Sequence, residues 1–305
     1  MVLTVRPVLE MKAMKKLLYR DWPWAIVFLA PSIVGMAVFT VYPLIASFYI
    51  SFTDWTLMSS MKWIGFDNYI RAFTDPTALT VFGNTVVFTL GTVPILLVLP
   101  LFLALALNRN LKGTRFFRAA YFLPTISSMV SMALVWQWML NKDFGILNYL
   151  LGFLGIPPIN WLTSKTWSMM GIIIVSVWKG TGYNMMLFLA GLQAIPSVYY
   201  EAADLDGCSA LRRLWKITVP LLKPTTLFVG VMSIINSFQA FDQVMVITGG
   251  GPARSTSVLV HYLYQNAFDY YDMGYACALG WLLTILVFAL TRLQFFANRS
   301  DYSIE

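Results

Sequence analysis

Charge is scarce in this chain, and histidine and cysteine are scarcer still. Only 11% of its 305 residues are Asp, Glu, Lys or Arg, whereas 58% are hydrophobic. A soluble domain carries about 25% charged residues, so the composition excludes an ordinary water-soluble fold. One histidine and two cysteines, His261, Cys208 and Cys277, are too few and too far apart for a metal cluster. We therefore expect no metal site.

Catalytic motifs are also missing. The sequence contains no Walker A motif, and no His stands with a Cys or Ser placed as a catalytic pair. An intramembrane protease would need a nucleophile and a base at membrane depth, but His261 is expected in an outer loop before the last apolar run. The chain is predicted to be non-catalytic, with no catalytic residue and no cofactor of its own.

Long apolar runs fill most of the sequence. A spanning helix needs about 20 apolar residues, and six runs meet that length, at about 24–48, 81–107, 119–140, 167–192, 225–247 and 273–293. The fold class predicted is an all-α integral membrane protein, a bundle of six transmembrane helices. We expect one transmembrane domain over 24–297, between a basic tail at 1–23 and a second tail at 298–305.

Positive charge alternates from one connection to the next. One set of connections holds most of the Lys and Arg residues, namely Arg6, Lys12, Lys15, Lys16, Arg20, Arg109, Lys112, Arg115, Arg118, Arg212, Arg213, Lys216, Lys223, Arg292 and Arg299. The other set holds Lys62, Arg71, Lys142, Lys165 and Arg254. This bias predicts that both termini are cytoplasmic (N-in/C-in). The same uneven distribution argues that the net charge of +7 does not serve to bind nucleic acid.

A polar loop at 196–223 separates the fourth and fifth apolar runs. Ser197 is a candidate N-cap for a helix at 198–205, and Asp206-Gly207 signals a turn. A second helix is expected at 209–217, ended by Pro220 and Pro224. On amphipathicity alone, a hairpin lying on lipid headgroups is as good an interpretation as a docking surface. The spacing of the loop resembles the EAA loop of permeases from ATP-binding-cassette (ABC) importers. The residues that carry the resemblance, and that it implies dock the ATPase, are Glu201, Ala202, Ala203, Asp206, Gly207, Ile217 and Pro220. Val219 stands for the Leu of that pattern.

Two polar stripes lie in the apolar runs on either side of this loop. Residues at i, i+3, i+4 and i+7 share one helix face. The first stripe consists of Ser176, Lys179, Gly180 and Tyr183. The second consists of Ser233, Asn236, Ser237 and Ala240, and Gln239 and Asp242 extend its polar character. Intramembrane polar groups face a bundle interior or a wet cavity. We interpret the stripes as the lining of a substrate path. Hydrogen bonding between helices is the alternative, and for Ser176, Ser233 and Ser237 taken singly it is equally good.

Lys179 and Asp242 are the only charges expected within their spans. An unpaired charge at membrane depth is costly. A salt bridge between them is the economical hypothesis.

The resemblance extends over most of the chain. Besides the loop, it rests on Ala30-Pro31-Ser32, Tyr42-Pro43, Gly65–Tyr69, Ala190–Gln193 and the segment Thr248, Gly249, Gly250, Gly251, Pro252, which look like the MalF-like carbohydrate-uptake permeases. It implies that 248–252 contacts an extracytoplasmic substrate-binding protein. The implied partners are a second, MalG-like permease, two ABC ATPase subunits that bind ATP and Mg, a sugar substrate and membrane lipid. The implied place is the bacterial inner membrane.

The implied mechanism is alternating access, in which ATPase closure pulls on the loop at 196–223 and opens the path outward. A stand-alone secondary carrier or channel for small polar solutes is the alternative function. It would use the same stripes, but it leaves the EAA-like spacing unexplained.

Overall fold

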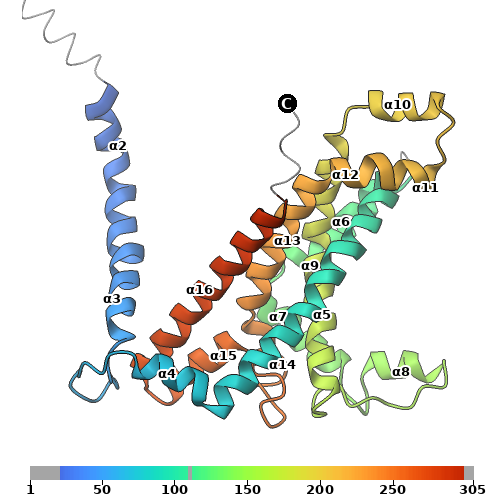
Figure 1. The fold of residues 1–305 in the computed structure, drawn as a ribbon. Helices are drawn as coiled ribbons and strands as arrows, with labels where there is room; N and C mark the ends of the chain where they lie inside the picture. Colours follow the sequence, from blue (N-terminus) through green and yellow to red (C-terminus); the bar gives the residue numbers. More distant parts are fainter. Residues whose placement is uncertain (1–20, 109–111, 299–305) are drawn as a thin grey trace, which may run out of the picture.

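The computed structural model describes residues 21–108 and 112–298 (Figure 1). They form helices joined by turns, with two isolated β-bridges, Thr53–Trp63 and Thr56–Asp272. The helices, with π-helical turns labelled η, are α2 (Asp21–Met36), η1 (Ala37–Val41), α3 (Tyr42–Ile50), α4 (Asp67–Thr74), α5 (Pro76–Leu107), α6 (Thr114–Ile126), α7 (Met129–Met139), α8 (Ile146–Gly152), α9 (Trp167–Gln193), α10 (Val198–Leu205), α11 (Ala210–Arg213), η2 (Leu214–Thr218), α12 (Val219–Leu221), α13 (Lys223–Phe238), α14 (Asp242–Ile247), α15 (Leu259–Tyr264), η3 (Gln265–Asp269) and α16 (Met273–Asn298).

Four of the described helices are long and apolar enough to cross a membrane: Trp24–Ile50, Pro76–Leu107, Trp167–Gln193 and Met273–Ala297. Two sharply bent helix pairs raise the number to as many as six if each pair crosses once. The predicted all-helical membrane class is therefore confirmed. Most of the predicted tails (1–23 and 298–305), namely residues 1–20 and 299–305 with their basic residues, and Arg109 lie outside the described residues.

The third predicted span is not one helix. Helices α6 and α7 meet at 103°, because Ser127 and Ser128 are extended, with ψ of 146° and 133°. Pro124 lies in the last turn of α6 and lacks the N–H that would continue the helical ladder. A continuous apolar run thus conceals a break whose carbonyl groups need other partners.

The fifth predicted span is also interrupted. Helix α13 ends at Phe238, and α14 begins only at Asp242. Phe241 between them has φ −140° and ψ −61°, outside the helical region. Helix α14 packs against α7, and the Gln137 amide donates to the carbonyl of Ile247 at 3.3 Å. The second half of each broken span therefore packs against the other.

Helices α5 and α9 form the centre of the bundle, with α6 against α9 and α13 against α5. The approach of α6 to α9 is very close at Gly182, where a Cβ would lie 1.9 Å from the Tyr121 carbonyl oxygen. Only glycine fits there. Phe188, Met185 and Leu222 are among the buried side chains between α5, α9 and α13.

A polar network ties α4 and the start of α5 to α15 and α16. Arg71 forms an ion pair with Asp272 at 2.7 Å, and its guanidinium lies 3.9 Å from the Tyr275 ring centroid. The Tyr262 hydroxyl donates to Asp75 at 2.7 Å. Burial raises the pKa of Asp75, but hydrogen bonds from Tyr262 and Thr77 outweigh it and lower the pKa below its ordinary value.

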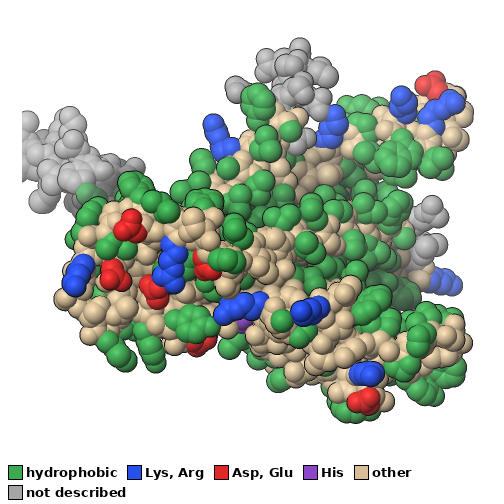
Figure 2. All heavy atoms as spheres, turned by 60° about the horizontal axis from the view of Figure 1, so that its bottom comes forward, with side chains coloured by type: hydrophobic (Ala, Val, Ile, Leu, Met, Phe, Trp, Pro, Cys, Tyr) green, Lys and Arg blue, Asp and Glu red, His purple; other side chains and the backbone are tan. Residues whose placement is uncertain are grey.

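The surface separates by polarity. Figure 2 shows Lys, Arg, Asp and Glu side chains on the loop-bearing end that faces the viewer and on the opposite end near α10 and α11, with mostly hydrophobic side chains between. The first helical segment, Trp24–Ile50, has no buried residue in its most apolar stretch. Its α2 part stands off the bundle (Figure 1), whereas α3 contacts α16. Figure 1 also shows the start of α2 and the end of α16 on the same side as α10.

Candidate functional site

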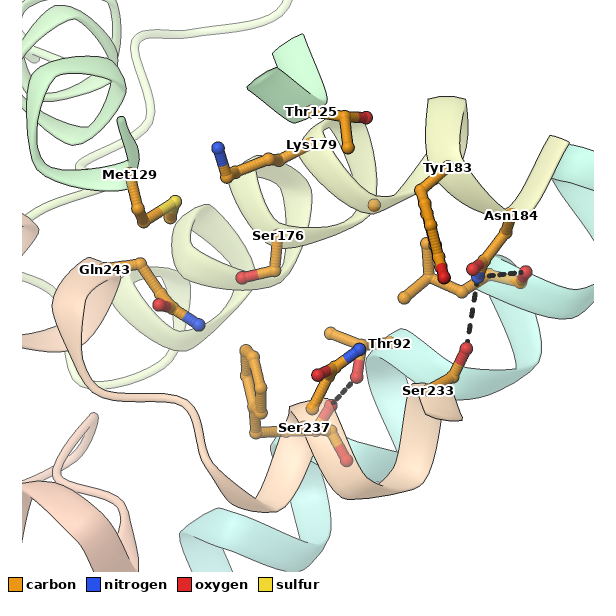
Figure 3. Close-up of a pocket in the computed structure, with 14 residues that line it drawn as sticks. Thr92, Thr125, Met129, Ser176, Lys179, Tyr183, Asn184, Ser233, Ser237 and Gln243 are labelled. Carbon is orange, nitrogen blue, oxygen red and sulfur yellow. Dashed lines mark hydrogen bonds between the residues drawn. The ribbon is translucent and has the colours of Figure 1, made fainter. Parts of the chain in front are cut away.

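A polar cavity lies between α5, α6, α7, α9, α13 and α14 (Figure 3). Its volume is about 290 Å³. Its lining consists of Phe88, Thr92, Leu96, Thr125, Met129, Ser176, Lys179, Gly180, Tyr183, Asn184, Ser233, Asn236, Ser237 and Gln243. The two stripes picked out from the sequence thus face each other across one space.

Seven of the ten residues predicted for the substrate path line this cavity: Ser176, Lys179, Gly180, Tyr183, Ser233, Asn236 and Ser237. The other three do not. Gln239 is exposed in the break after α13, Ala240 is buried in the apolar core, and Asp242 begins α14. Helical spacing placed Ala240 on this face, but α13 ends at Phe238. Gln239 and Asp242 were added as an extension of the polar character. None of the three borders this cavity, and their place on the substrate path stays a prediction.

Both interpretations of the stripes, the lining of a path and hydrogen bonding between helices, apply to the serines. Ser233 accepts a hydrogen bond from the Asn184 amide at 3.1 Å, and Ser237 bonds Thr89 of α5 at 3.0 Å. Both serines are about 95% buried, so they link helices and border the cavity at once. Ser176 donates to the carbonyl of Ile172 within its own helix. Asn236 and Tyr183 are the more exposed side chains of the lining.

Several lining residues were missed from the sequence: Phe88, Thr92, Leu96, Thr125, Met129, Asn184 and Gln243. Asn184 was detectable as an amide next to Tyr183 within an apolar run. Its Nδ2 also donates to the Leu96 carbonyl of α5 at 3.1 Å. Thr125 and Met129 flank the break between α6 and α7, which no sequence pattern marked. They reach the cavity only because that break turns the chain.

Lys179 is not paired with Asp242. Its ammonium group donates to the carbonyls of Pro124 and Ser127, at 3.1 and 2.5 Å. These carbonyls belong to the C-terminal end of α6, where a positive charge is favoured. In the described part of the chain no carboxylate lies within ion-pair distance of Lys179, so the salt-bridge hypothesis is wrong for this conformation.

The loop at 196–223 forms a helical hairpin that projects from one end of the bundle (Figure 1). Helix α10 has the predicted bounds, 198–205. Gly207 has φ +65° with open space around its Cα, a left-handed turn that suits glycine. The Cys208 amide closes the turn on the Ala203 carbonyl at 2.9 Å, and Arg213 pairs with Asp204 at 2.5 Å.

The hairpin leaves most of its predicted docking residues accessible. Glu201, Ala202, Asp206 and Pro220 are exposed, Ile217 is half-buried and Ala203 is buried. Large apolar side chains lie beside them in solvent: Leu205 is 90% exposed, and Leu211 and Trp215 exceed 60%. Exposed apolar side chains on a short, projecting element are typical of a surface that docks another protein.

Two details of the hairpin differ from the sequence prediction. Pro220 does not end the second helix, which continues as α12 to Leu221, because a proline is accommodated in the first turn of a helical segment. Pro224 stands in the first turn of α13. Ser197 occupies the position before α10 but makes no capping hydrogen bond through its side chain.

The segment from Thr248 to Pro252 forms a compact turn after α14. The hydroxyls of Thr248 and Thr256 bond each other at 2.8 Å, and Thr256 donates to the Gly251 carbonyl at 2.8 Å. A Cβ on Gly250 would lie 2.5 Å from the His261 ring. Burial and the nearby Arg254 lower the pKa of His261, so a neutral imidazole supports this turn. Gly249 remains exposed.

Residues 72–299 match the family described as "Binding-protein-dependent transport system inner membrane component". The chain belongs to this family. It is thus an inner-membrane permease with several helices able to cross the membrane. The predicted family resemblance is confirmed.

Individual relatives agree with this assignment. The permease is 39% identical to the probable ABC transporter permease protein YesP of Bacillus subtilis, over 88% of each chain. It is 38% identical to the lactose transport system permease protein LacF of Rhizobium radiobacter, over 89% of this chain and 93% of the relative. Its fold resembles the bacterial alginate ABC transporter solved with an alginate pentasaccharide-bound periplasmic protein, with a TM-score of 0.82, 21% identity and coverage of 94% and 98%.

Proposed function

We propose that this permease forms the sugar-translocating path of an ATP-driven, binding-protein-dependent importer that works by alternating access. One observation carries the proposal: the cavity walls continue directly into the projecting hairpin. Helix α9 supplies Ser176 to Asn184 and ends at Gln193, and α13 begins at Lys223 and supplies Ser233 to Ser237. A rigid displacement of the hairpin would therefore move both walls, which is how ATPase closure would be transmitted.

The hairpin is the proposed docking element for the ATPase. Glu201, Ala202, Ala203, Asp206, Gly207, Ile217 and Pro220 would form the contact, together with the exposed Leu205 and Trp215. We infer two ATPase subunits, which bind ATP and Mg, and a second, MalG-like permease. The permease itself would perform no chemistry and hold no cofactor.

The topology proposed is six spans with both termini in the cytoplasm. With the four long helices, the bent pair α6–α7 and helix α13 with α14 would complete six crossings. The described cations at the α10 end, Lys112, Arg115, Arg118, Arg212, Arg213, Lys216, Lys223 and Arg292, support a cytoplasmic location for that end. Residues 24–297 would form the transmembrane domain, with cytoplasmic tails at 1–23 and 298–305, and the exposed apolar helix Trp24–Ile50 would face lipid or the second permease.

The substrate proposed is a sugar. Hydroxyl and amide groups at Ser176, Ser233, Asn236, Ser237 and Gln243 can exchange hydrogen bonds with sugar hydroxyls, and Tyr183 is 38% exposed and can stack on a sugar ring. The relative named for lactose transport and the fold neighbour of alginate import support this class. At the other end, Thr248, Gly249, Gly250, Gly251 and Pro252 would contact the binding protein.

The test is co-purification of the tagged permease from mild-detergent membranes of its host. Wild type should bring down an ABC ATPase, and Gly207→Pro should lose it because proline cannot adopt φ +65°. Gly155→Pro is the matched control. Gly155 also has positive φ, +72°, and open surroundings, but lies in the loop after α8.

Gly155→Pro should retain the ATPase. Wild type that is recovered alone and transports a solute without ATP would contradict the proposal and leave a stand-alone carrier in its place.

A further inference from the structure

We propose that Lys179 and Thr125 form a subsite for one oxyanion group of the substrate, so that the permease carries an acidic saccharide or sugar ester. A carboxylate, sulfonate or phosphate shares the required chemistry. The inference rests on the proposed function, because it assigns the substrate class of the same cavity.

The ammonium group of Lys179 is held at the cavity wall by two of its three N–H donors, which leaves one N–H for a ligand. A lysine ammonium has three N–H donors. The carbonyls of Pro124 and Ser127 accept two of them, which fixes the group beside the break between α6 and α7. Lys179 also lines the cavity. The remaining N–H is available to an acceptor that enters it.

Thr125 supplies a second, independent sign of a missing acceptor. Its Oγ1 is buried and has no hydrogen-bond partner, and the residue lines the same cavity. A buried hydroxyl without a partner is costly. Figure 3 shows Thr125 and Lys179 along the same edge of the cavity, across from Ser237. An oxyanion at that edge would accept from Lys179, and from Thr125 once rotation of its side chain turns the buried hydroxyl toward the cavity.

No acidic side chain neutralises the lining. Among the fourteen lining residues, Lys179 is the only charged one, and the other polar members are hydroxyls and amides. Asp242 acts on the ammonium electrostatically, but it lies outside the lining and beyond ion-pair contact. The cavity therefore presents one positive charge at membrane depth, where solvent screening is weak. A neutral sugar would leave that charge without a counter-ion in the cavity.

The test uses the assembled importer in lipid nanodiscs without its binding protein, so that the cavity alone selects the ligand. Equilibrium binding is measured for labelled glucuronate and glucose, and for glycerol 3-phosphate and glycerol. A charge-assisted hydrogen bond predicts that each anionic probe binds about tenfold or more tightly than its neutral counterpart. Thr125→Val should weaken the anionic probes by a few-fold and leave the neutral ones unchanged.

Charge variants separate recognition from structure. Lys179→Gln keeps amide donors for the two carbonyls but removes the charge, so the preference should fall to about one. Lys179→Arg should retain the preference. Lys142→Gln is the control, because Lys142 is an exposed lysine outside the lining and its loss should change nothing. Co-purified ATPase and an unchanged melting temperature show that each variant is assembled.

Equal binding of anionic and neutral probes by wild type would overturn the subsite, as would a preference that survives Lys179→Gln, or no saturable binding of either anion. An importer that assembles with its ATPase and takes up a sugar, yet shows no anion preference, refutes the subsite alone. A permease that recruits no ATPase refutes the proposed function.

Discussion

The cavity and the hairpin use their polar groups in opposite ways. In the cavity, Asn184 donates to the Leu96 carbonyl and the Ser233 hydroxyl, and Lys179 donates to the Pro124 carbonyl, all of them on neighbouring helices and far away in sequence. In the hairpin, the Asp204–Arg213 pair and the Cys208–Ala203 bond join residues only a few positions apart. The cavity is therefore a product of tertiary packing, whereas the hairpin is specified locally and its outer face remains free for a partner.

Replacing one glycine by alanine in each region is expected to give the largest difference in stability between the two regions. Gly182→Ala puts a Cβ 1.9 Å from the Tyr121 carbonyl oxygen. It must push α6 from α9, at a cost of about 3 kcal/mol or more. Gly207→Ala meets no atom within 4 Å and costs only the strain of a left-handed residue, about 1–2 kcal/mol. Thermal melting of the purified permease should show a large loss for the first and a small one for the second.

Equal melting temperatures for the two alanine variants would contradict the contrast between the packed α6–α9 interface beside the cavity and the local turn. Gly83→Ala is a suitable third variant, since Gly83 lies in α5 with nothing within 4 Å. It should melt at or slightly above wild type, because alanine favours a helix more than glycine does.

Removing a polar partner from each region sharpens the comparison. Asn184→Leu leaves the Leu96 carbonyl and Ser233 without this donor in a buried site, which should cost about 1–3 kcal/mol. Arg213→Ala removes an ion pair whose side chains are 33% and 63% exposed, which should cost about 0–1 kcal/mol. Denaturant titration in detergent checks both values. An Arg213→Ala loss as large as that of Asn184→Leu would show that the hairpin depends on more than local contacts.

Prediction from the sequence succeeded where local rules decide the structure. Helix α10 has the expected bounds because its ends depend on the turn at Gly207, and the stripes on α9 and α13 follow helical spacing. The breaks at Ser127–Ser128 and at Gln239–Phe241 were missed, because both lie in continuous apolar runs. An apolar run indicates that a segment is buried in lipid, but it does not indicate where the helix in that segment breaks.

The partner of Lys179 could not be predicted for the same reason. The sequence offered Asp242 as the only opposite charge at a similar depth. The structure instead satisfies the ammonium with the Pro124 and Ser127 carbonyls, which the break after α6 leaves without the i+4 N–H partners of a continuous helix. Gln239, Ala240 and Asp242 were assigned to the substrate path on the expectation of one continuous helix, but α13 ends at Phe238 and none of the three borders the cavity.

The smallest expected effect is a pH dependence of stability at Asp75, which lies at the start of α5, at the opposite end of the molecule from the hairpin. The folded-state pKa of Asp75 is lowered, so this carboxylate contributes stability that is present above its unfolded pKa and lost as the pH falls through the folded value. Asp75→Asn should melt slightly below wild type at neutral pH, since an amide oxygen can still accept from Tyr262. The gap should narrow as the pH falls below about 4. A gap that widens on acidification would contradict this sign.

The central claim is that movement of the hairpin changes access to the cavity. It is tested most directly by Asn236→Cys in a Cys208→Ser, Cys277→Ser background, since these are the two native cysteines. The importer is reconstituted in vesicles, and labelling by an impermeant thiol reagent from the binding-protein side is timed. We predict that ATP with binding protein accelerates labelling, and that Gly207→Pro abolishes the acceleration. The same rate with and without ATP, or acceleration that persists in Gly207→Pro, would contradict the account.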